Sequence, residues 1–263
     1  MVKLCVFDVD GTLVTKGDRA VAASSIEALR ALRKQGVKLA IASGRPPFAM
    51  EKSLLEQVDF DYFICSNGAC VLTGDHNILH RFSFTHEETQ ALIDYFKRTD
   101  NALMFQCVEA VHCYHGYKRI ANMLEQFLGR LDILVDEREH PVYIQKDLPL
   151  AAVAKIVDAD KEEIQKAFPD FVFTPFAHEF YDINGQHNKA TGIQYICDAL
   201  GFDMSEVAAF GDDMNDMEMI QASGYGIAMG NAKECVKDAA RYVTSRVDED
   251  GIYHACQHFH WVD

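Results

Sequence analysis

The sequence lacks the features that mark membrane, secreted and nucleic-acid-binding proteins. No apolar run approaches the length of a membrane span, and the first residues carry no signal-peptide pattern. The eight cysteines form no Cys-x-x-Cys pair, which predicts reduced thiols in a cytoplasmic protein. Positive charge is scarce, because 25 Lys and Arg stand against 40 Asp and Glu, for a net charge of −15. Bulk electrostatics therefore disfavour nucleic acid and anionic membranes as partners, and an anionic substrate would need positive charge supplied locally.

The remaining composition is that of a soluble globular protein. With 263 residues, 49% of them hydrophobic, the chain can bury one large core or two moderate ones. Residues 3–7 and 37–42 are short apolar runs, typical of strands buried on both faces, and the residues between them show helical spacing. Ser24 or Ser25 is the expected N-cap of that helix. A strand, a helix and a second strand in this order predict a parallel sheet and an α/β fold.

Two carboxylates, Asp8 and Asp10, stand where the first strand should end, just before a Gly-Thr turn. Residues two apart on a strand point the same way, so both can reach one crevice. Two like charges this close need a cation or a shared proton. Carboxylates at the carboxyl end of a central strand are hard ligands suited to Mg²⁺, and open α/β sheets bind ligands at that edge. An ordinary exit from a strand into a turn remains the alternative.

Polar, glycine-containing turns also follow the next two strands. Ser43, Gly44 and Arg45 follow the second strand, and Asn67 follows a third strand predicted at 62–65. A hydroxyl, backbone N–H groups exposed by glycine and a following helix N-terminus can form a cradle for phosphate. By itself, each turn fits equally well a plain turn that caps the next helix.

From about residue 82, short strands and helices alternate in a way that suggests local pairing. Thr85 is expected to cap a helix, with Glu88 as its capping-box partner. Strand-like or helical segments then follow at 103–108, 111–114, 120–127, 153–157, 161–168, 171–174 and 179–183. This predicts a smaller α+β unit, residues 82–184, inserted into a core made of residues 1–81 and 185–263.

Lys189 lies in the first turn of a helix predicted to begin at Asn188. The helix dipole disfavours a cation there, so a bound anion beside Lys189 would account for its position. A solvated surface lysine is the alternative.

Acidic and amide side chains crowd the end of a later strand, 207–210, and the helix turn that follows it. Acids favour helix N-termini, which offers a structural reason for Asp213 and Asp216. Asp212 is not explained in this way, and it should point into the same crevice as Asp8. Further along the chain, Asn231 and Glu234 are expected to form a second capping box.

Two other segments have weaker signals. A helix is expected over residues 50–55. In the terminal helix, His254 and His258 are four residues apart and share one face, a spacing that can hold a transition metal weakly.

Taken together, these segments resemble the haloacid dehalogenase-like superfamily. Its four motifs match, in order and at strand ends, residues 8–12, 43–45, Lys189 and 211–216. The closing segments 226–232 and 248–251 resemble the Cof-type branch (subfamily IIB), in which a large C2-type α/β cap lies between the second and third motifs. The resemblance is strong over both ends of the chain. It implies a doubly wound, Rossmann-like core and a Mg²⁺-dependent phosphatase for small phosphorylated metabolites such as sugar phosphates.

The resemblance also implies roles for the carboxylates. Asp8 would attack phosphorus and become an aspartyl phosphate, which divides one difficult displacement into two easier ones. Asp10 would protonate the leaving alcohol and then accept a proton from the attacking water. Mg²⁺ would bind Asp8, the backbone carbonyl of Asp10, and Asp212.

Other matched positions are implied to contact the substrate or to support the metal ligands. The residues implied to bind phosphate, with Ser43 and Lys189 also catalytic, are Ser43, Gly44, Lys189 and Asn215. Arg45 and Asn67, at neighbouring strand ends, could contact the substrate, but both could equally cap helices or turns. Asp213 and Asp216 would orient the metal ligands. The chain departs from the pattern at Ala190 and Asp213, where relatives often carry glycine, which leaves the local backbone shape open.

Three other functions fit parts of this pattern. A sugar phosphomutase would use the same nucleophile and a similar cap, but would return the phosphoryl group to the sugar. A non-enzymatic phospho-acceptor of the response-regulator type also uses clustered acids and a lysine, although it would lack the insertion and a counterpart of Asp10. A fold that only binds a partner would not need intact motifs.

Overall fold

The computed structural model describes residues 1–263 except 16–19, 51–56, 140–146, 158–159, 178 and 263. The helix predicted over 50–55 lies outside these residues, apart from Met50. Contacts divide the chain into two units. The first contains Met1–Arg45, Ala49–His80 and His187–Asp263, and the second contains Pro46–Phe48 and Arg81–Gln186.

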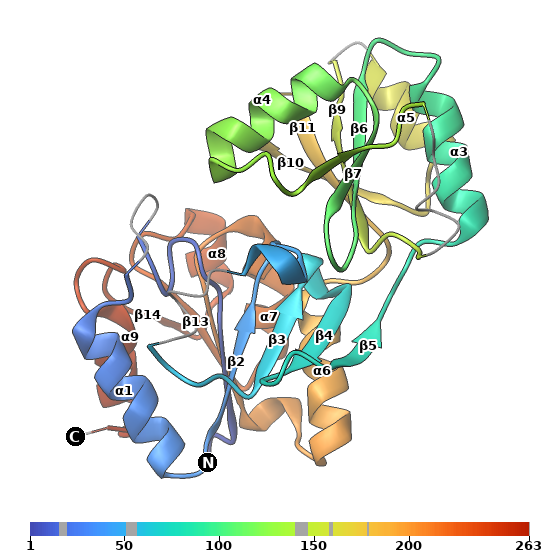
Figure 1. Ribbon diagram of the computed structural model, residues 1–263. Helices are drawn as coiled ribbons and strands as arrows, with labels where there is room; N and C mark the ends of the chain where they lie inside the picture. Colours follow the sequence, from blue (N-terminus) through green and yellow to red (C-terminus); the bar gives the residue numbers. More distant parts are fainter. Residues whose placement is uncertain (16–19, 51–56, 140–146, 158–159, 178, 263) are drawn as a thin grey trace. The chain divides into compact units, whose positions relative to one another are not determined.

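The first unit is built on an eight-stranded sheet with the strand order β14-β13-β12-β1-β2-β3-β4-β5 (Figure 1). The strands from β14 to β3 are parallel, and β4 runs antiparallel to β3. The bounds are β1 (Leu4–Phe7), β2 (Lys38–Ala42), β3 (Tyr62–Cys65), β4 (Cys70–Thr73), β5 (Ile78–Arg81), β12 (Val207–Gly211), β13 (Tyr225–Ala228) and β14 (Tyr242–Val243). This parallel sheet confirms the predicted α/β class.

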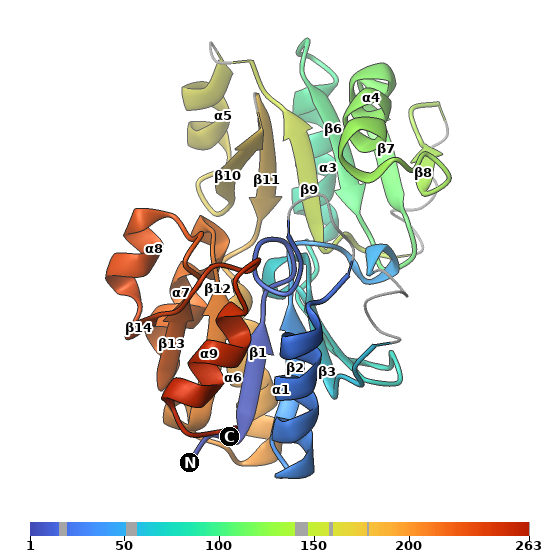
Figure 2. The ribbon, with the colours of Figure 1, turned by 90° about the vertical axis from the view of Figure 1, so that its left-hand side faces the viewer.

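Helices cover both faces of this sheet because its central strands are apolar on both faces. Leu4 and Val6 of β1 pack on one face against α6 (Lys189–Leu200) and α7 (Met217–Ala222). On the other face Phe7 stacks on Phe210, with ring centroids 4.7 Å apart. Figures 1 and 2 show α1 (Ala23–Lys34) and α9 (Gly251–His258) side by side across the sheet from α6. The unit also contains α8 (Glu234–Ala239).

The second unit contains a six-stranded sheet in the order β10-β11-β9-β6-β7-β8, antiparallel except between β7 and β8. The strands are β6 (Ala102–Gln106), β7 (Val111–His115), β8 (Leu134–Asp136), β9 (Ala151–Lys155), β10 (Val172–Ala177) and β11 (Phe180–Asn184). The sequence pattern after residue 82 indicates strands that pair locally, with helices between them. The antiparallel pairs of this sheet have that arrangement.

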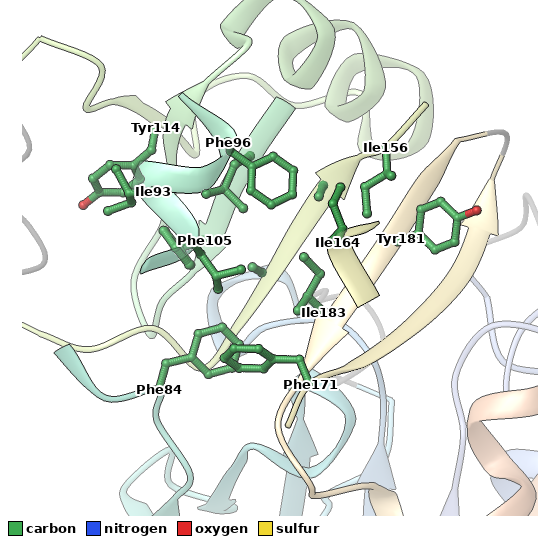
Figure 3. Packing of buried hydrophobic residues seen from close by; sticks show 14 of the residues in the cluster. Phe84, Ile93, Phe96, Phe105, Tyr114, Ile156, Ile164, Phe171, Tyr181 and Ile183 are labelled. Carbon is green, nitrogen blue, oxygen red and sulfur yellow. The ribbon is translucent and has the colours of Figure 1, made fainter. Parts of the chain in front are cut away.

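Helices lie on both faces of this second sheet as well. On one face α3 (His86–Phe96) and α5 (Lys161–Ala167) cover a core in which Phe84, Phe105 and Phe171 meet (Figure 3). On the other face α4 (Tyr117–Leu128) packs Ile120 against β6, β7 and β9.

Of the predicted helix caps, one is confirmed and two are wrong. Thr85 and Glu88 form the predicted capping box of α3. The cap of α1 is Ala22, and Ser24 lies inside the helix, where its hydroxyl donates to Asp250. The cap of α8 is Lys233, which makes no side-chain cap bond, so Asn231 has a different role described below.

Two further features bear on the sequence-based expectations. All eight cysteines are free thiols, and seven of them are buried. Over the described ranges, no helix combines the length and the apolar character that crossing a membrane requires.

Candidate active site

The carboxyl ends of β1 and β12 bring Asp8 and Asp212 to the same edge of the sheet. The two strands are paired in parallel, and the Asp8 N–H continues their ladder by donating to the Phe210 carbonyl at 3.0 Å. The turn after β1 lies in close contact with the Asp212 side chain. Gly11 has a φ of +102°, and a Cβ built on it would lie 2.3 Å from Asp212 Oδ2. Glycine is required here both for the left-handed backbone and for the close approach of the carboxylate.

Three buried carboxylates converge at this edge. Asp8, Asp212 and Asp216 each place an oxygen within 4.8 Å of the others. Burial and, to a smaller extent, the neighbouring Asp216 carboxylate raise the pKa of Asp8 to about 8, although Lys189 opposes the shift. Three carboxylates and one lysine leave an excess of negative charge when ionised, and the ligand atoms that the carboxylates offer are all hard oxygens. This set fits a small divalent cation such as Mg²⁺.

Lys189 is the first residue of α6, and its side chain is completely buried. Its Nζ lies 2.6 Å from Asp8 Oδ1 and 2.6 Å from Asp216 Oδ1. Burial alone would lower the pKa of Lys189, but the two carboxylates raise it above its usual value. The surface alternative considered for this lysine is therefore excluded.

The start of α6 is held in place from two sides. Asn188 forms a reciprocal capping box with Thr191, whose N–H donates to the Asn188 Oδ1 at 3.1 Å. The turn after β3 lies against the same residue, since a Cβ built on Gly68 would lie 2.0 Å from the Asn188 carbonyl oxygen. The position of Lys189 thus depends on local capping and on a glycine 121 positions earlier in the chain.

Asp216 organises the turn after β12. Its Oδ2 accepts hydrogen bonds from the backbone N–H groups of Asp212 at 2.8 Å and Asp213 at 3.0 Å, while Oδ1 binds Lys189. Asp213 instead turns its side chain toward Lys233, with Oδ1 and Nζ 2.5 Å apart. The structure thus places Asp216 among the converging carboxylates and pairs Asp213 with a lysine on the outside of the turn.

The turn after β2 carries Ser43, Gly44 and Arg45. Ser43 is buried, and its Oγ accepts the Arg45 N–H at 3.1 Å. The Arg45 guanidinium binds both oxygens of Asp10, from Nε to Oδ2 at 3.0 Å and from Nη2 to Oδ1 at 2.6 Å. Asp10 therefore pairs with Arg45, whereas Asp8, on the same strand end, pairs with Lys189.

The turn after β3 brings Asn67 to the same edge in an unusual backbone conformation. Ser66 and Asn67 have φ values of +47° and +53°, so two successive residues other than glycine are left-handed. The Asn67 N–H donates to the Ser43 carbonyl at 3.0 Å, and the Asn215 amide donates to Asn67 Oδ1 at 3.0 Å. Backbone strain of this kind persists where surrounding contacts impose it, commonly at functional sites.

Sequence reasoning missed the role of Asn231. Its Nδ2 donates to the Gly11 carbonyl at 2.8 Å, and its Oδ1 accepts the Val247 N–H at 2.8 Å. Asn231 therefore fixes the Asp10 turn from a loop more than 200 residues away. The only sequence signal was its place in a Gly-Asn-Ala turn after an apolar strand.

The histidines of the terminal helix lie apart from this site. His254 pairs through Nδ1 with Ser245 Oγ at 3.0 Å, and His258 stacks on Tyr242 with centroids 4.0 Å apart. Within the part of the chain that the structure describes, the carboxylates of Asp8, Asp212 and Asp216 form the one group of three or more potential metal ligands.

Chemically, the arrangement offers a nucleophile and a means of holding an anion. One oxygen of Asp8 is fixed by an ammonium group, which leaves the other for attack or for a metal. The buried Ser43 hydroxyl, Asn67, Asn215 and Lys189 supply hydrogen-bond donors along the same edge. Such a site can bind a phosphoryl group despite the protein's net charge of −15.

Comparisons with known proteins identify the family of the chain. A family model described as haloacid dehalogenase-like hydrolase matches residues 5–256. The chain is similar to the phosphoglycolate phosphatase of Methanopyrus kandleri, with 29% identity over 96% of this chain and 94% of the relative. It is 27% identical to the 5-amino-6-(5-phospho-D-ribitylamino)uracil phosphatase YcsE of Bacillus subtilis, over 99% and 96%.

A solved structure gives the same result for the fold. The HAD subclass IIB sugar phosphatase BT4131 superposes with a TM-score of 0.85 and 29% identity, covering 99% of this chain and all of the other.

Proposed function

The chain belongs to the haloacid dehalogenase-like hydrolases and is a phosphatase, and we propose that it is a Mg²⁺-dependent enzyme for small phosphate monoesters that works through an aspartyl phosphate. The observation that carries the proposal is the contact of Lys189 Nζ with Asp8 Oδ1 at 2.6 Å, beside the carboxylates of Asp212 and Asp216. A buried carboxylate fixed by a lysine at a site suited to a divalent cation is equipped to accept a phosphoryl group.

In the proposed first half reaction, Asp8 attacks phosphorus. A bond forms between an Asp8 oxygen and phosphorus, and the bond from phosphorus to the ester oxygen breaks, with its electron pair leaving on that oxygen. Asp10 donates the proton that the departing alkoxide needs. Lys189, Ser43 and the Gly44 N–H hold the phosphoryl oxygens as charge spreads over them.

In the second half reaction, water attacks the aspartyl phosphate. Its proton passes to the Asp10 carboxylate, and the bond from phosphorus to Asp8 breaks, returning the electron pair to Asp8. Mg²⁺ held by Asp8, the Asp10 carbonyl and Asp212 would neutralise phosphoryl charge. Asp216 would keep the Asp212 turn in position, as its two hydrogen bonds to backbone N–H groups suggest.

The substrates named for relatives support the proposed substrate class. They include a phosphatase for phosphoglycolate, one for a phosphorylated ribitylaminouracil and one for sugar phosphates, all small phosphate monoesters. We propose a small phosphorylated metabolite for this chain too, with residues 1–81 and 185–263 as the catalytic core and residues 82–184 as a specificity-determining cap.

The test is phosphate release from a panel of sugar, nucleotide and carboxylic-acid phosphates, with Mg²⁺ and with EDTA. We expect Mg²⁺-dependent release of inorganic phosphate. A hexose 1-phosphate converted to its isomer without phosphate release would instead identify a phosphomutase. A stable phosphoprotein without turnover would identify a phospho-acceptor.

A further inference from the structure

Arg45 forms a two-point contact with Asp10 that the sequence analysis did not predict. Its guanidinium binds both Asp10 oxygens, at 3.0 Å and 2.6 Å, with side-chain exposures of 22% for Arg45 and 45% for Asp10. A planar fork of this kind fits a phosphate as well as a carboxylate. In this protein, two of its N–H donors are used on a neighbouring side chain.

The backbone of Arg45 is fixed as firmly as its side chain. Its N–H donates to Ser43 Oγ at 3.1 Å, and its carbonyl accepts the Ser66 N–H at 2.9 Å. Arg45 is therefore connected to the turns after β1, β2 and β3 together. A guanidinium held in this way can impose one orientation on the Asp10 carboxylate.

We propose that Arg45 is a positioning residue, which holds the Asp10 carboxylate for the attack of water on the aspartyl phosphate instead of binding the substrate phosphate. This inference rests on the proposed function. Asp10 stands on a partly exposed turn, so its side chain would otherwise sample several rotamers. A proton acceptor must lie within about 2.6–3.2 Å of its donor, and a misplacement of about 1 Å costs roughly 100-fold in rate.

The two half reactions depend on Asp10 to different extents when the leaving group is good. p-Nitrophenolate leaves without a proton, so phosphorylation of Asp8 by p-nitrophenyl phosphate needs little help from Asp10. Hydrolysis of the aspartyl phosphate still requires the proton of water to be accepted. Loss of a positioning residue for Asp10 should therefore slow the second half reaction alone.

The experiment compares Arg45→Gln with Arg33→Gln as a matched control. Arg33 also pairs with an aspartate, Asp61, at 2.9 Å, but on α1 and at the amino-terminal end of β3. With p-nitrophenyl phosphate and Mg²⁺, we expect kcat of Arg45→Gln to fall roughly 10- to 100-fold, with KM falling in parallel. A burst of about one p-nitrophenol per enzyme should precede the slow phase. The control should keep wild-type kinetics.

A double variant tests whether the effect of Arg45 on the rate depends on Asp10. In an Asp10→Asn background, Arg45→Gln should change the steady-state rate by less than about twofold, because the residue it positions no longer functions. Arg45→Lys keeps the positive charge but lacks the planar pair of N–H donors, so it should show a burst and smaller falls in kcat and KM than Arg45→Gln. It replaces Arg45→Gln in the experiment if that variant folds poorly.

Either of two results would overturn the inference. A fall in kcat/KM with raised KM and no burst would mean that Arg45 binds the phosphate directly. Independent, additive losses from Arg45→Gln and Asp10→Asn would mean that Arg45 does not act through Asp10. If the folded wild-type protein releases no phosphate with Mg²⁺, the proposed function itself is wrong. No result obtained with the Arg45 variants alone would lead to that conclusion.

Discussion

Lys189 and Asp216 form a completely buried ion pair, with Nζ 2.6 Å from Oδ1 and no exposed side-chain surface on either residue. The pair extends to Asp8, whose Oδ1 lies 2.6 Å from the same amine. One lysine therefore balances two carboxylates in a site that contains a third, Asp212. This shared, incomplete charge compensation links the stability of the site to its chemistry.

Removing the nucleophile should abolish activity without unfolding the protein. Asp8→Asn keeps the shape of the side chain and its contact with Lys189, but the amide cannot form an aspartyl phosphate. We expect phosphate release to fall more than about 10³-fold, with an unchanged circular dichroism spectrum. Mass spectrometry after incubation with substrate should show no phosphoprotein. Substantial remaining Mg²⁺-dependent turnover would contradict the assignment of Asp8.

Removing the buried lysine should destabilise the fold strongly. Lys189→Met leaves Asp8 and Asp216 without a cation in a buried site, and breaking a buried pair in this way costs about 3–5 kcal/mol. Urea unfolding at pH 7 measures the loss. The control is Lys3→Met, because Lys3 pairs with Glu206 at 2.8 Å on the surface and should cost less than about 1 kcal/mol. Equal losses in the two variants would contradict this account.

A methyl group at Gly11 should damage the metal site. In Gly11→Ala, the new Cβ would lie 2.3 Å from Asp212 Oδ2, so the carboxylate must move. We expect a higher Mg²⁺ concentration for half-maximal activity, by roughly tenfold or more. Gly36→Ala is the matched control, since Gly36 also has a left-handed φ, +84°, but nothing lies within 4 Å of the added carbon. It should cost about 1–2 kcal/mol in backbone strain and leave Mg²⁺ dependence unchanged.

Mg²⁺ should stabilise the folded protein because it relieves repulsion among Asp8, Asp212 and Asp216. Binding to the folded state alone contributes about 2.7 kcal/mol at 100 times the dissociation constant. Thermal unfolding with increasing MgCl₂ should show a rising midpoint, which EDTA reverses. Asp212→Asn should lose most of this response. A wild-type midpoint that ignores Mg²⁺ would count against the metal site.

Stability should fall with rising pH because of Asp182 on β11. Burial raises the pKa of Asp182 to about 7 from the ordinary value of 3.8. Between these pH values the folded state holds a proton that the unfolded state has lost, so the folded state becomes less stable as the pH rises. The loss is complete above the folded pKa. Asp182→Asn should therefore stabilise the protein at pH 8 by about 2–4 kcal/mol and much less at pH 4.5. Urea unfolding at both pH values tests this, and an equal effect at the two would refute it.

Local patterns were sufficient to predict the central strands of the first unit and the edge of the sheet that holds the site. Short apolar runs ending in polar turns predicted β1, β2, β3 and β12, and parallel pairing places their carboxyl ends at one edge. The capping box at Thr85 was predictable because all of its atoms come from residues within one helical turn. The cap expected at Asn231 was wrong, because a tertiary contact with Gly11 uses that side chain instead.

Hydrophobic periodicity and turn chemistry act over a few neighbouring positions, so they were enough to predict the α/β class and the residues at the strand ends. The pairing of those side chains is visible only in the folded molecule: Lys189 pairs with Asp8 and Asp216, Arg45 with Asp10, and Asp213 with Lys233. The physical reason is that charge pairing depends on distances of a few ångströms between segments up to 181 residues apart. Such distances follow from packing of the whole sheet and its helices, which no local pattern records.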